Sequence, residues 1–188
     1  RRSGMSTASW YPSGLSAAYH LRRRGYVPAG DTDQSAPTFV VLDADAHPGG
    51  AWQHRWESLR MATVNGIHEL PGAPVPAADP TLPSRDVLPA YFAEYESRFA
   101  LDVQRPVRVR AVRRADDDPL GRLVVETDAG EWSTRFVVNA TGTWTRPFWP
   151  HYPGQERFAG RQLHVADYVG ADEFAGQRVV IVGGGISA

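Results

Sequence analysis

The sequence predicts an α/β fold that enters a second domain close to its carboxyl end. Three observations predict it: an apolar run at 39–43 typical of a buried parallel strand, two segments with helical spacing of apolar residues, and three strand-like runs joined by short turns. Strand, helix and antiparallel runs in this order favour a mixed α/β domain, and no internal repeat of solenoid length is present.

Two helices are expected before the antiparallel runs. Residues 13–25, SGLSAAYHLRRRG, place their apolar side chains mostly on one face, with Ser13 able to cap the helix and Gly25 able to stop it. Residues 85–101, RDVLPAYFAEYESRFAL, repeat the helical spacing with larger aromatic side chains, and Ser84 is the expected cap.

The strand-like runs divide into one parallel candidate and one meander. FVVLD at 39–43 is apolar, largely β-branched and ends on a carboxylate. The runs at 106–112, 121–130 and 131–142 are joined by the short, turn-rich stretches ADDDP and DAGE, so they predict an antiparallel β-meander. Residues 62–84 hold many prolines and alanines without a period, and they predict a long connection over the surface.

Composition excludes several classes of function. The 188 residues carry a formal net charge of −1, which gives no indication of a nucleic-acid partner. The chain has no cysteine and all 20 basic residues are arginine, so it holds no disulfide, no redox cysteine pair and no P-loop lysine. The histidines show no metal-binding spacing, and no metal site is expected. No apolar stretch approaches the roughly 18 residues of a membrane span and no signal peptide is evident, so we expect a cytoplasmic protein without a membrane partner.

The chain ends on a glycine-rich turn. RVVIV is an apolar strand, and Gly183, Gly185 and Ala188 follow it at the spacing of a G-x-G-x-x-G/A dinucleotide fingerprint. In such a turn the first glycine bends the chain, the second lets the backbone approach a pyrophosphate, and the third small residue lets a helix pack on the strand. The turn alone is equally compatible with an ordinary strand-to-loop connection.

Two further positions follow apolar runs. Asp43 could accept hydrogen bonds from a ribose 2′-OH, as an acidic residue does at the end of the second strand of a dinucleotide fold, or it could be a turn aspartate. Ala140, Thr141 and Gly142 could present backbone amides to a phosphate or a ring edge, or they could form an ordinary turn.

Four stretches, taken in order, resemble the flavin-containing monooxygenases and the related two-dinucleotide flavoprotein superfamily. They are FVVLDADAHPGGAW, NATGTWTRPFWPHYPG, FAGRQLHVADY and RVVIVGGGISA. The third stretch contains Phe158, Gly160, His164 and Tyr168, which match the F-x-G-x-x-x-H-x-x-x-Y form of that superfamily's linker motif. For His164 the alternative is a linker histidine with only a structural hydrogen bond.

The resemblance implies a Rossmann-like FAD-binding domain that is incomplete here and a second nucleotide-binding domain of which the chain holds the first strand. Residues 1–12 would be irregular and lack the first strand of the FAD domain. Residues 13–150 would form the partial FAD-binding domain, with its β-meander near 106–139. Residues 151–176 would form the linker, and residues 177–188 would begin the NAD(P)H-binding domain.

The resemblance also implies which residues contact the cofactors. Those implied to contact FAD are, in chain order, Gly14, Asp43, Gly49, Gly50, Trp52, Ala140, Thr141 and Gly142. Asp43 would bind the adenosine ribose, and the turn at 49–52 would lie beside the flavin. The NADPH pyrophosphate turn would begin with Gly183, Gly185 and Ala188.

The activity implied by the resemblance is that of an FAD- and NADPH-dependent oxidoreductase, with NADH as the alternative donor. In this family NADPH reduces the flavin, oxygen adds at C4a, and the hydroperoxyflavin attacks a small-molecule substrate, so no catalytic side chain is expected. Two alternatives stay open: a flavoprotein NAD(P)H reductase of the same fold, and a non-catalytic truncated remnant.

The amino-terminal end departs from the family pattern. Counting back from Gly14, the first two glycine positions of the FAD turn hold Ser9 and Tyr11, and no apolar strand precedes them. A tyrosine side chain would occupy space where a pyrophosphate needs bare backbone. We therefore expect the 188-residue chain by itself to bind FAD poorly and to be inactive.

Overall fold

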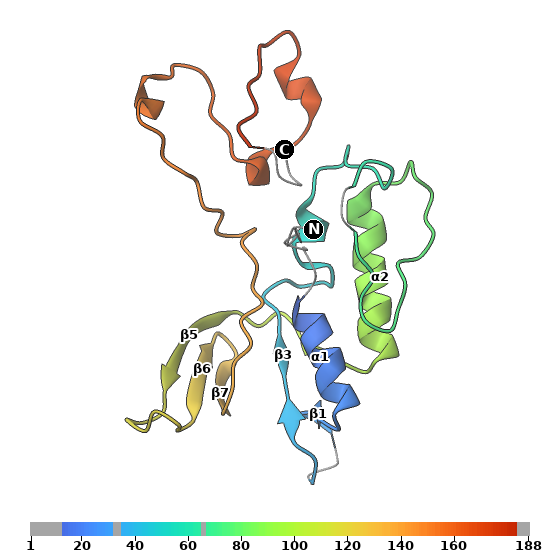
Figure 1. Ribbon diagram of the computed structural model, residues 1–188, viewed down its shortest axis with the longest axis vertical. Coiled ribbons are helices and arrows are strands. Elements are labelled where there is room, and N and C mark those ends of the chain that lie inside the picture. Colours follow the sequence, from blue (N-terminus) through green and yellow to red (C-terminus); the bar gives the residue numbers. More distant parts are fainter. Residues whose placement is uncertain (1–12, 32–34, 65–66, 184–188) are drawn as a thin grey trace, which may run out of the picture.

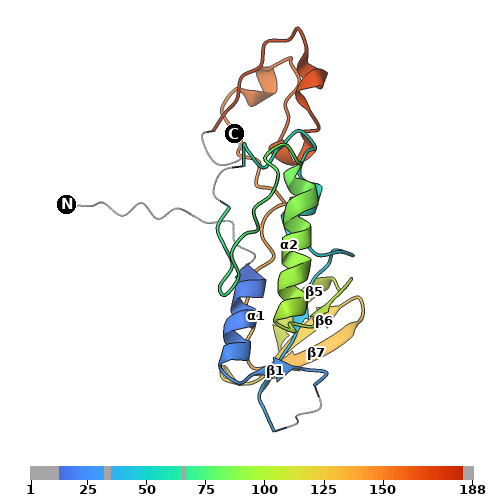
Figure 2. The same ribbon diagram turned by 90° about the vertical axis from the view of Figure 1, so that its right-hand side faces the viewer.

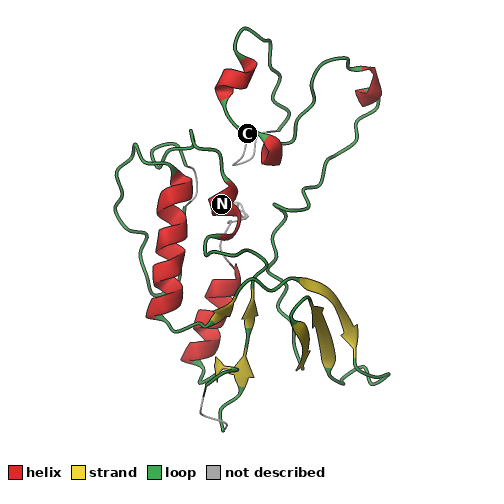
Figure 3. Cartoon of the chain, turned by 180° about the vertical axis from the view of Figure 1, so that it is seen from behind, coloured by secondary structure: helices red, strands yellow, loops and turns green. Residues whose placement is uncertain are grey.

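The computed structural model of the chain describes residues 13–31, 35–64 and 67–183. The two α-helices are α1 (Ser13–Arg23) and α2 (Ser84–Arg98). The described strands are β1 (Val27–Pro28), β2 (Thr38–Phe39), β3 (Val41–Leu42), β4 (Val103–Gln104), β5 (Val109–Arg114), β6 (Leu123–Thr127) and β7 (Gly130–Thr134). The short 3-10 turns are η1 (Gly50–His54), η2 (Gln155–Arg157), η3 (Val165–Asp167) and η4 (Ala171–Phe174). Figure 3 shows the strands gathered at one end of the molecule and long loops at the other.

The run at 39–43 was expected to be one continuous strand, but two short strands form there, each in its own parallel pair. β1 pairs with β2 and β3 pairs with β4, both in parallel. The run expected at 39–43 is interrupted at Val40, so it forms as two strands of two residues each. The parallel pairing expected of this run is confirmed, whereas the described residues contain no continuous Rossmann sheet.

The helices α1 and α2 lie side by side and carry most of the core (Figures 1 and 2). Both form where the spacing of apolar residues predicts them. The buried core residues are Leu15, Ala18, Phe39, Leu70, Ala73, Leu88, Tyr91, Phe92, Tyr95 and Leu101. The ring of Tyr19 on α1 packs edge-on against Phe99 at the end of α2, with 4.8 Å between ring centroids. Helical periodicity therefore identifies the packed faces correctly.

The ends of α2 differ from the expectation. Pro83 is the N-cap, and Ser84 is the first residue inside the helix, where its side chain makes no capping hydrogen bond. The Ser84 hydroxyl is fully buried and has no hydrogen-bond partner among the described residues. The helix ends at Arg98 and not at Leu101, because Ala100 has a φ of 48° that a right-handed helix cannot include.

The connection at 62–84, expected on the surface, is anchored in the core at Leu70 and Ala73. The Tyr91 hydroxyl accepts the Leu70 N–H at 2.9 Å and donates to the Ala73 carbonyl at 2.8 Å. The Tyr95 hydroxyl donates to the Pro71 carbonyl at 2.8 Å. The expectation of a surface loop is therefore wrong at these residues, because two buried tyrosines on α2 satisfy backbone groups that a buried loop would otherwise leave unpaired.

The expected meander forms as a three-stranded antiparallel sheet in the order β5-β6-β7. β5 begins at Val109, later than the run expected at 106–112. The reason is that the Val107 N–H donates to the Asp43 carbonyl at 2.7 Å, so Val107 extends the β3 edge and not the meander. β6 and β7 meet in a tight turn with Thr127 opposite Gly130.

Two extended runs do not form the strands expected of them. The run expected at 131–142 is a strand only to the end of β7, and Phe136 is 83% exposed. The expected final strand at 178–182 is not formed, and Val180 is 85% exposed. Within the described ranges, residues 135–142 and 178–182 have no neighbouring strand, and a strand without a neighbour gains no ladder hydrogen bonds. The segment after β7 rises past the helices to the end opposite the sheet (Figures 1 and 2).

None of the helices that the structure describes has both the length and the apolar composition to cross a membrane. The same described residues contain no group of three or more His, Asp or Glu side chains placed to hold a metal ion.

Candidate functional site

The amino-terminal end of α1 meets the turn at 140–142. A Cβ atom built on Gly14 would lie 3.6 Å from the Ala140 Cβ, which is ordinary van der Waals contact. The Thr141 N–H and hydroxyl both donate to Asn139 Oδ1, at 3.3 and 3.0 Å, and this fixes the shape of the turn. Gly142 has a φ of 64° and nothing within 4 Å of its missing side chain. Two segments that the sequence separates by more than a hundred residues thus come together, and Gly142 faces open space.

Asp43 follows β3, the strand that α1 contacts. Its backbone continues the parallel pairing, because its N–H donates to the Gln104 carbonyl at 3.1 Å. Its carboxylate accepts the Arg105 Nε–H at 2.8 Å through Oδ2 and the Asp45 N–H at 3.1 Å through Oδ1. The side chain is 26% exposed, so a ligand can still reach it.

The two glycines of the expected turn at 49–52 have different surroundings. A Cβ on Gly49 would lie 2.8 Å from the Pro89 Cβ, so this glycine, with a φ of 125°, allows the turn to pack closely on α2. Gly50 has a φ of 49° and open space at the position of its missing side chain. Trp52 is partly buried against the core. Close packing explains Gly49 without a ligand, whereas Gly50 leaves room for one.

A buried arginine lies among three tryptophans near this turn. The Arg55 guanidinium carbon lies 4.3 Å from the Trp144 ring centroid, 5.3 Å from that of Trp52 and 5.7 Å from that of Trp56. Desolvation by burial lowers the pKa of Arg55, and the electron-rich faces of the indoles stabilise its charge. This cluster joins the 49–56 region to residue 144. Sequence reasoning missed Arg55, because the only signal was the pair of tryptophans at 52 and 56.

The linker motif is partly tied to the same region. The Tyr168 ring packs edge-on against Trp56 at 5.3 Å between centroids. His164 Nδ1 accepts the Ala166 N–H at 3.1 Å and caps η3, so this nitrogen is an acceptor and not a proton donor. A Cβ on Gly160 would lie 2.5 Å from the exposed Phe158 ring, so a larger residue at this position would require that ring to move. The structure thus gives His164 a capping hydrogen bond and links Tyr168 to the tryptophans.

The terminal turn is described only in part. Gly183 has a φ of 129° and open space around it. Gly185 and Ala188 lie outside the described residues, as do Ser9 and Tyr11 at the other end.

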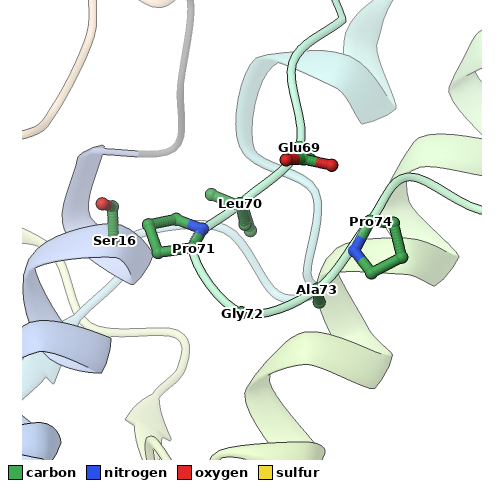
Figure 4. Close-up of a pocket in the computed structure, with 7 residues that line it drawn as sticks. All are labelled: Ser16, Glu69, Leu70, Pro71, Gly72, Ala73 and Pro74. Carbon is green, nitrogen blue, oxygen red and sulfur yellow. The ribbon is translucent and has the colours of Figure 1, made fainter.

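A further pocket of about 530 Å³ lies beside α1. Figure 4 shows Ser16 on α1 beside the loop at 69–74, whose residues supply the rest of the lining. None of its lining residues was predicted as a cofactor contact, and the pocket has no group suited to redox chemistry.

The chain's own residues fit the adenosine and phosphate end of a dinucleotide in three respects. The amino-terminal end of an 11-residue helix favours anions, and Gly14 lies in its first turn. Gly142 leaves open space next to bare backbone. Asp43 is a partly exposed carboxylate after a parallel strand, where a ribose is bound in dinucleotide folds.

Comparison with known proteins is consistent with this fit to a dinucleotide. Residues 53–188 match the family model described as pyridine nucleotide-disulphide oxidoreductase. The chain is 35% identical over 178 residues to the indole-3-pyruvate monooxygenase YUCCA1 of Oryza sativa subsp. japonica, which covers 94% of this chain and 41% of that protein. It is 27% identical to the uncharacterized oxidoreductase CzcO of Bacillus velezensis, over 93% of this chain and 46% of CzcO.

Comparison with solved structures also finds monooxygenases. A flavin-containing monooxygenase from Stenotrophomonas maltophilia superposes with a TM-score of 0.68 at 42% identity, covering 89% of this chain and 47% of that one. An oxidized steroid monooxygenase bound to NADP superposes with a TM-score of 0.51 at 23% identity and supports the fold alone. The chain therefore spans less than half the length of each of these relatives. It belongs to the pyridine nucleotide-disulphide oxidoreductase family, within the FAD- and NAD(P)-binding superfamily that includes the flavin monooxygenases.

Proposed function

We propose that the chain forms most of the adenosine-binding side of the FAD site, and the start of the NADPH site, of a flavin-dependent monooxygenase. The observation that carries this proposal is the meeting of Gly14 in the first turn of α1 with Ala140, next to the strand that leads to Asp43. The similarity to a flavin-containing monooxygenase at 42% identity supports it.

Each part has a physical role in this proposal. The α1 amino-terminal end and the backbone around Gly142 would hold the FAD phosphates, since a helix amino-terminal end favours anions and Gly142 has open space at the position of its missing side chain. The Asp43 carboxylate would accept hydrogen bonds from the adenosine ribose. Trp52 would shield the flavin side of the cofactor from water, and Gly50 would leave room for the cofactor beside it. Gly183, with Gly185 and Ala188, would begin the turn that binds the NADPH pyrophosphate.

The redox chemistry would come from bound FAD, which accepts electrons from NADPH and activates oxygen at C4a, as the family resemblance implies. The side chains of this chain would bind, orient and exclude water, and none of them is required as an acid or a base. The substrate would be a small molecule, with no nucleic-acid or membrane partner.

The test uses the product of the complete reading frame that encodes this chain. The protein is purified, reconstituted with FAD and assayed for NADPH oxidation under ¹⁸O₂ with indole-3-pyruvate and with simple thioethers as trial substrates. We expect a yellow protein with FAD near one equivalent, faster oxidation of NADPH than of NADH, and ¹⁸O in a product.

Three results would contradict parts of the proposal. NADPH oxidation that yields only hydrogen peroxide with every trial substrate would favour the reductase alternative. Absence of FAD binding together with absence of NADPH oxidation would favour the non-catalytic remnant. Faster oxidation of NADH than of NADPH would reassign the electron donor alone.

A further inference from the structure

One guanidinium, that of Arg105, holds two carboxylates from different parts of the chain. Its Nε donates to Asp43 Oδ2 at 2.8 Å, while Nη1 and Nη2 donate to the two carboxylate oxygens of Glu96 at 2.6 and 2.7 Å. The three side chains are only 13%, 26% and 12% exposed for Arg105, Asp43 and Glu96. Asp43 follows β3, Arg105 follows β4 and Glu96 lies near the end of α2.

The two carboxylates have different roles because they accept from different nitrogens of Arg105. Glu96 accepts hydrogen bonds from both terminal nitrogens, and this two-point contact fixes the plane of the guanidinium. The remaining Nε–H then points at Asp43 in one direction, so the Asp43 side chain is held in one orientation. Burial alone would lower the pKa of Arg105, but hydrogen bonds and charge from Glu96 and then Asp43 outweigh it and raise the pKa, which keeps the group charged.

Asp43 retains binding capacity while it is held. Its two oxygens each accept one hydrogen bond, from Arg105 and from the Asp45 N–H, and a carboxylate offers about four acceptor positions. The three charged groups leave one negative charge uncompensated. This suits neutral hydroxyl donors such as those of a ribose, and it disfavours a phosphorylated ribose.

We propose that Arg105 is a positioning residue that fixes the Asp43 carboxylate for the adenosine ribose of the flavin dinucleotide, with Glu96 as its anchor. This inference rests on the proposed function. An ion pair that only joined β4 to α2 would need Glu96 and Arg105 alone, whereas the Nε contact aims the same guanidinium at the predicted ribose-binding carboxylate.

The test separates the two halves of the cofactor. The product of the complete reading frame is freed of flavin and titrated with FAD, with FMN, which lacks the adenosine, and with ADP, which lacks the flavin. The variants are R105Q, D43N, the double variant D43N/R105Q, and R105K. We expect R105Q to weaken the binding of FAD and of ADP by about tenfold and to leave the binding of FMN unchanged. The double variant should bind FAD no more weakly than D43N, and R105K should recover part of the loss.

Several results would overturn the inference. The first is that R105Q binds FAD as tightly as the wild type does. The second is that R105Q loses affinity for FMN and FAD equally. The third is that the losses in FAD-binding free energy of D43N and R105Q add fully in the double variant. If R105Q does not fold, E96Q keeps the guanidinium and removes its anchor. E96Q is then expected to lose affinity for FAD and ADP only, and by less than R105Q. Unchanged affinity of E96Q for FAD and ADP would refute the anchor role. Failure of the wild type to bind FAD or ADP would instead refute the proposed function, and this inference with it.

Discussion

The hydroxyl of Tyr91 is predicted to be a main support of the buried loop at 70–73. Tyr91 is 5% exposed, and Y91F keeps its ring but removes the one oxygen that serves both the Leu70 N–H and the Ala73 carbonyl. Each buried backbone group left without a partner costs about 1–3 kcal/mol, so the loss of both bonds should lower the free energy of unfolding by about 2–6 kcal/mol. Y95F removes a single bond, to the Pro71 carbonyl, and should cost about half as much.

The assay is urea unfolding of the purified protein followed by tryptophan fluorescence. Y152F is the matched control, because Tyr152 is 50% exposed and its replacement should change the free energy by less than about 0.5 kcal/mol. If Y91F is no less stable than Y152F, the account of how this loop is buried is wrong.

Three further predictions concern glycine packing, tyrosine ionisation and cofactor binding. G49A should destabilise the protein by about 1–3 kcal/mol more than G130A, since both glycines have φ near 125° but only the first would place a Cβ 2.8 Å from Pro89; equal midpoints in urea would contradict the close packing. Burial, with Tyr19 and Tyr91 nearby, raises the pKa of Tyr95 above its ordinary value of 10.0, so the stability that its neutral hydroxyl contributes is complete below pH 10 and declines above it. Stability measured from pH 9 to 11.5 should therefore fall less steeply in Y95F, and parallel curves would count against this. The 188-residue chain alone should bind FAD poorly, and flavin absorbance near one equivalent in that purified chain would show the opposite.

Local patterns predicted the elements whose side chains pack along one face. The periodicity of apolar residues located α1 and α2, because a helix buries every third or fourth residue whatever lies opposite. Short turn-rich joints located the meander β5-β6-β7, since hairpins depend on nearby residues. The part of the expected run at 131–142 that follows β7 did not form a strand, nor did the expected strand at 178–182, because a strand depends on a neighbour and neither segment has one in the described part of the chain.

The candidate site was less accessible to sequence reasoning, because its contacts are non-local. Asp43 was identified from its place after an apolar run, but Arg105 lies 62 positions later and carries no motif. Arg55 was missed for a similar reason, since its nearest tryptophan, Trp144, is far along the chain. The burial of Leu70 depended on hydroxyls from α2 that no pattern in the loop reveals.

The central claim is that Asp43 binds the adenosine ribose of FAD, and a crystal structure of the FAD complex of the complete gene product tests it most directly. The account predicts an Asp43 carboxylate oxygen within about 3.2 Å of a ribose hydroxyl, with the Arg105 and Glu96 contacts intact. An adenosine bound elsewhere, or a ribose more than about 4 Å from that carboxylate, would contradict it.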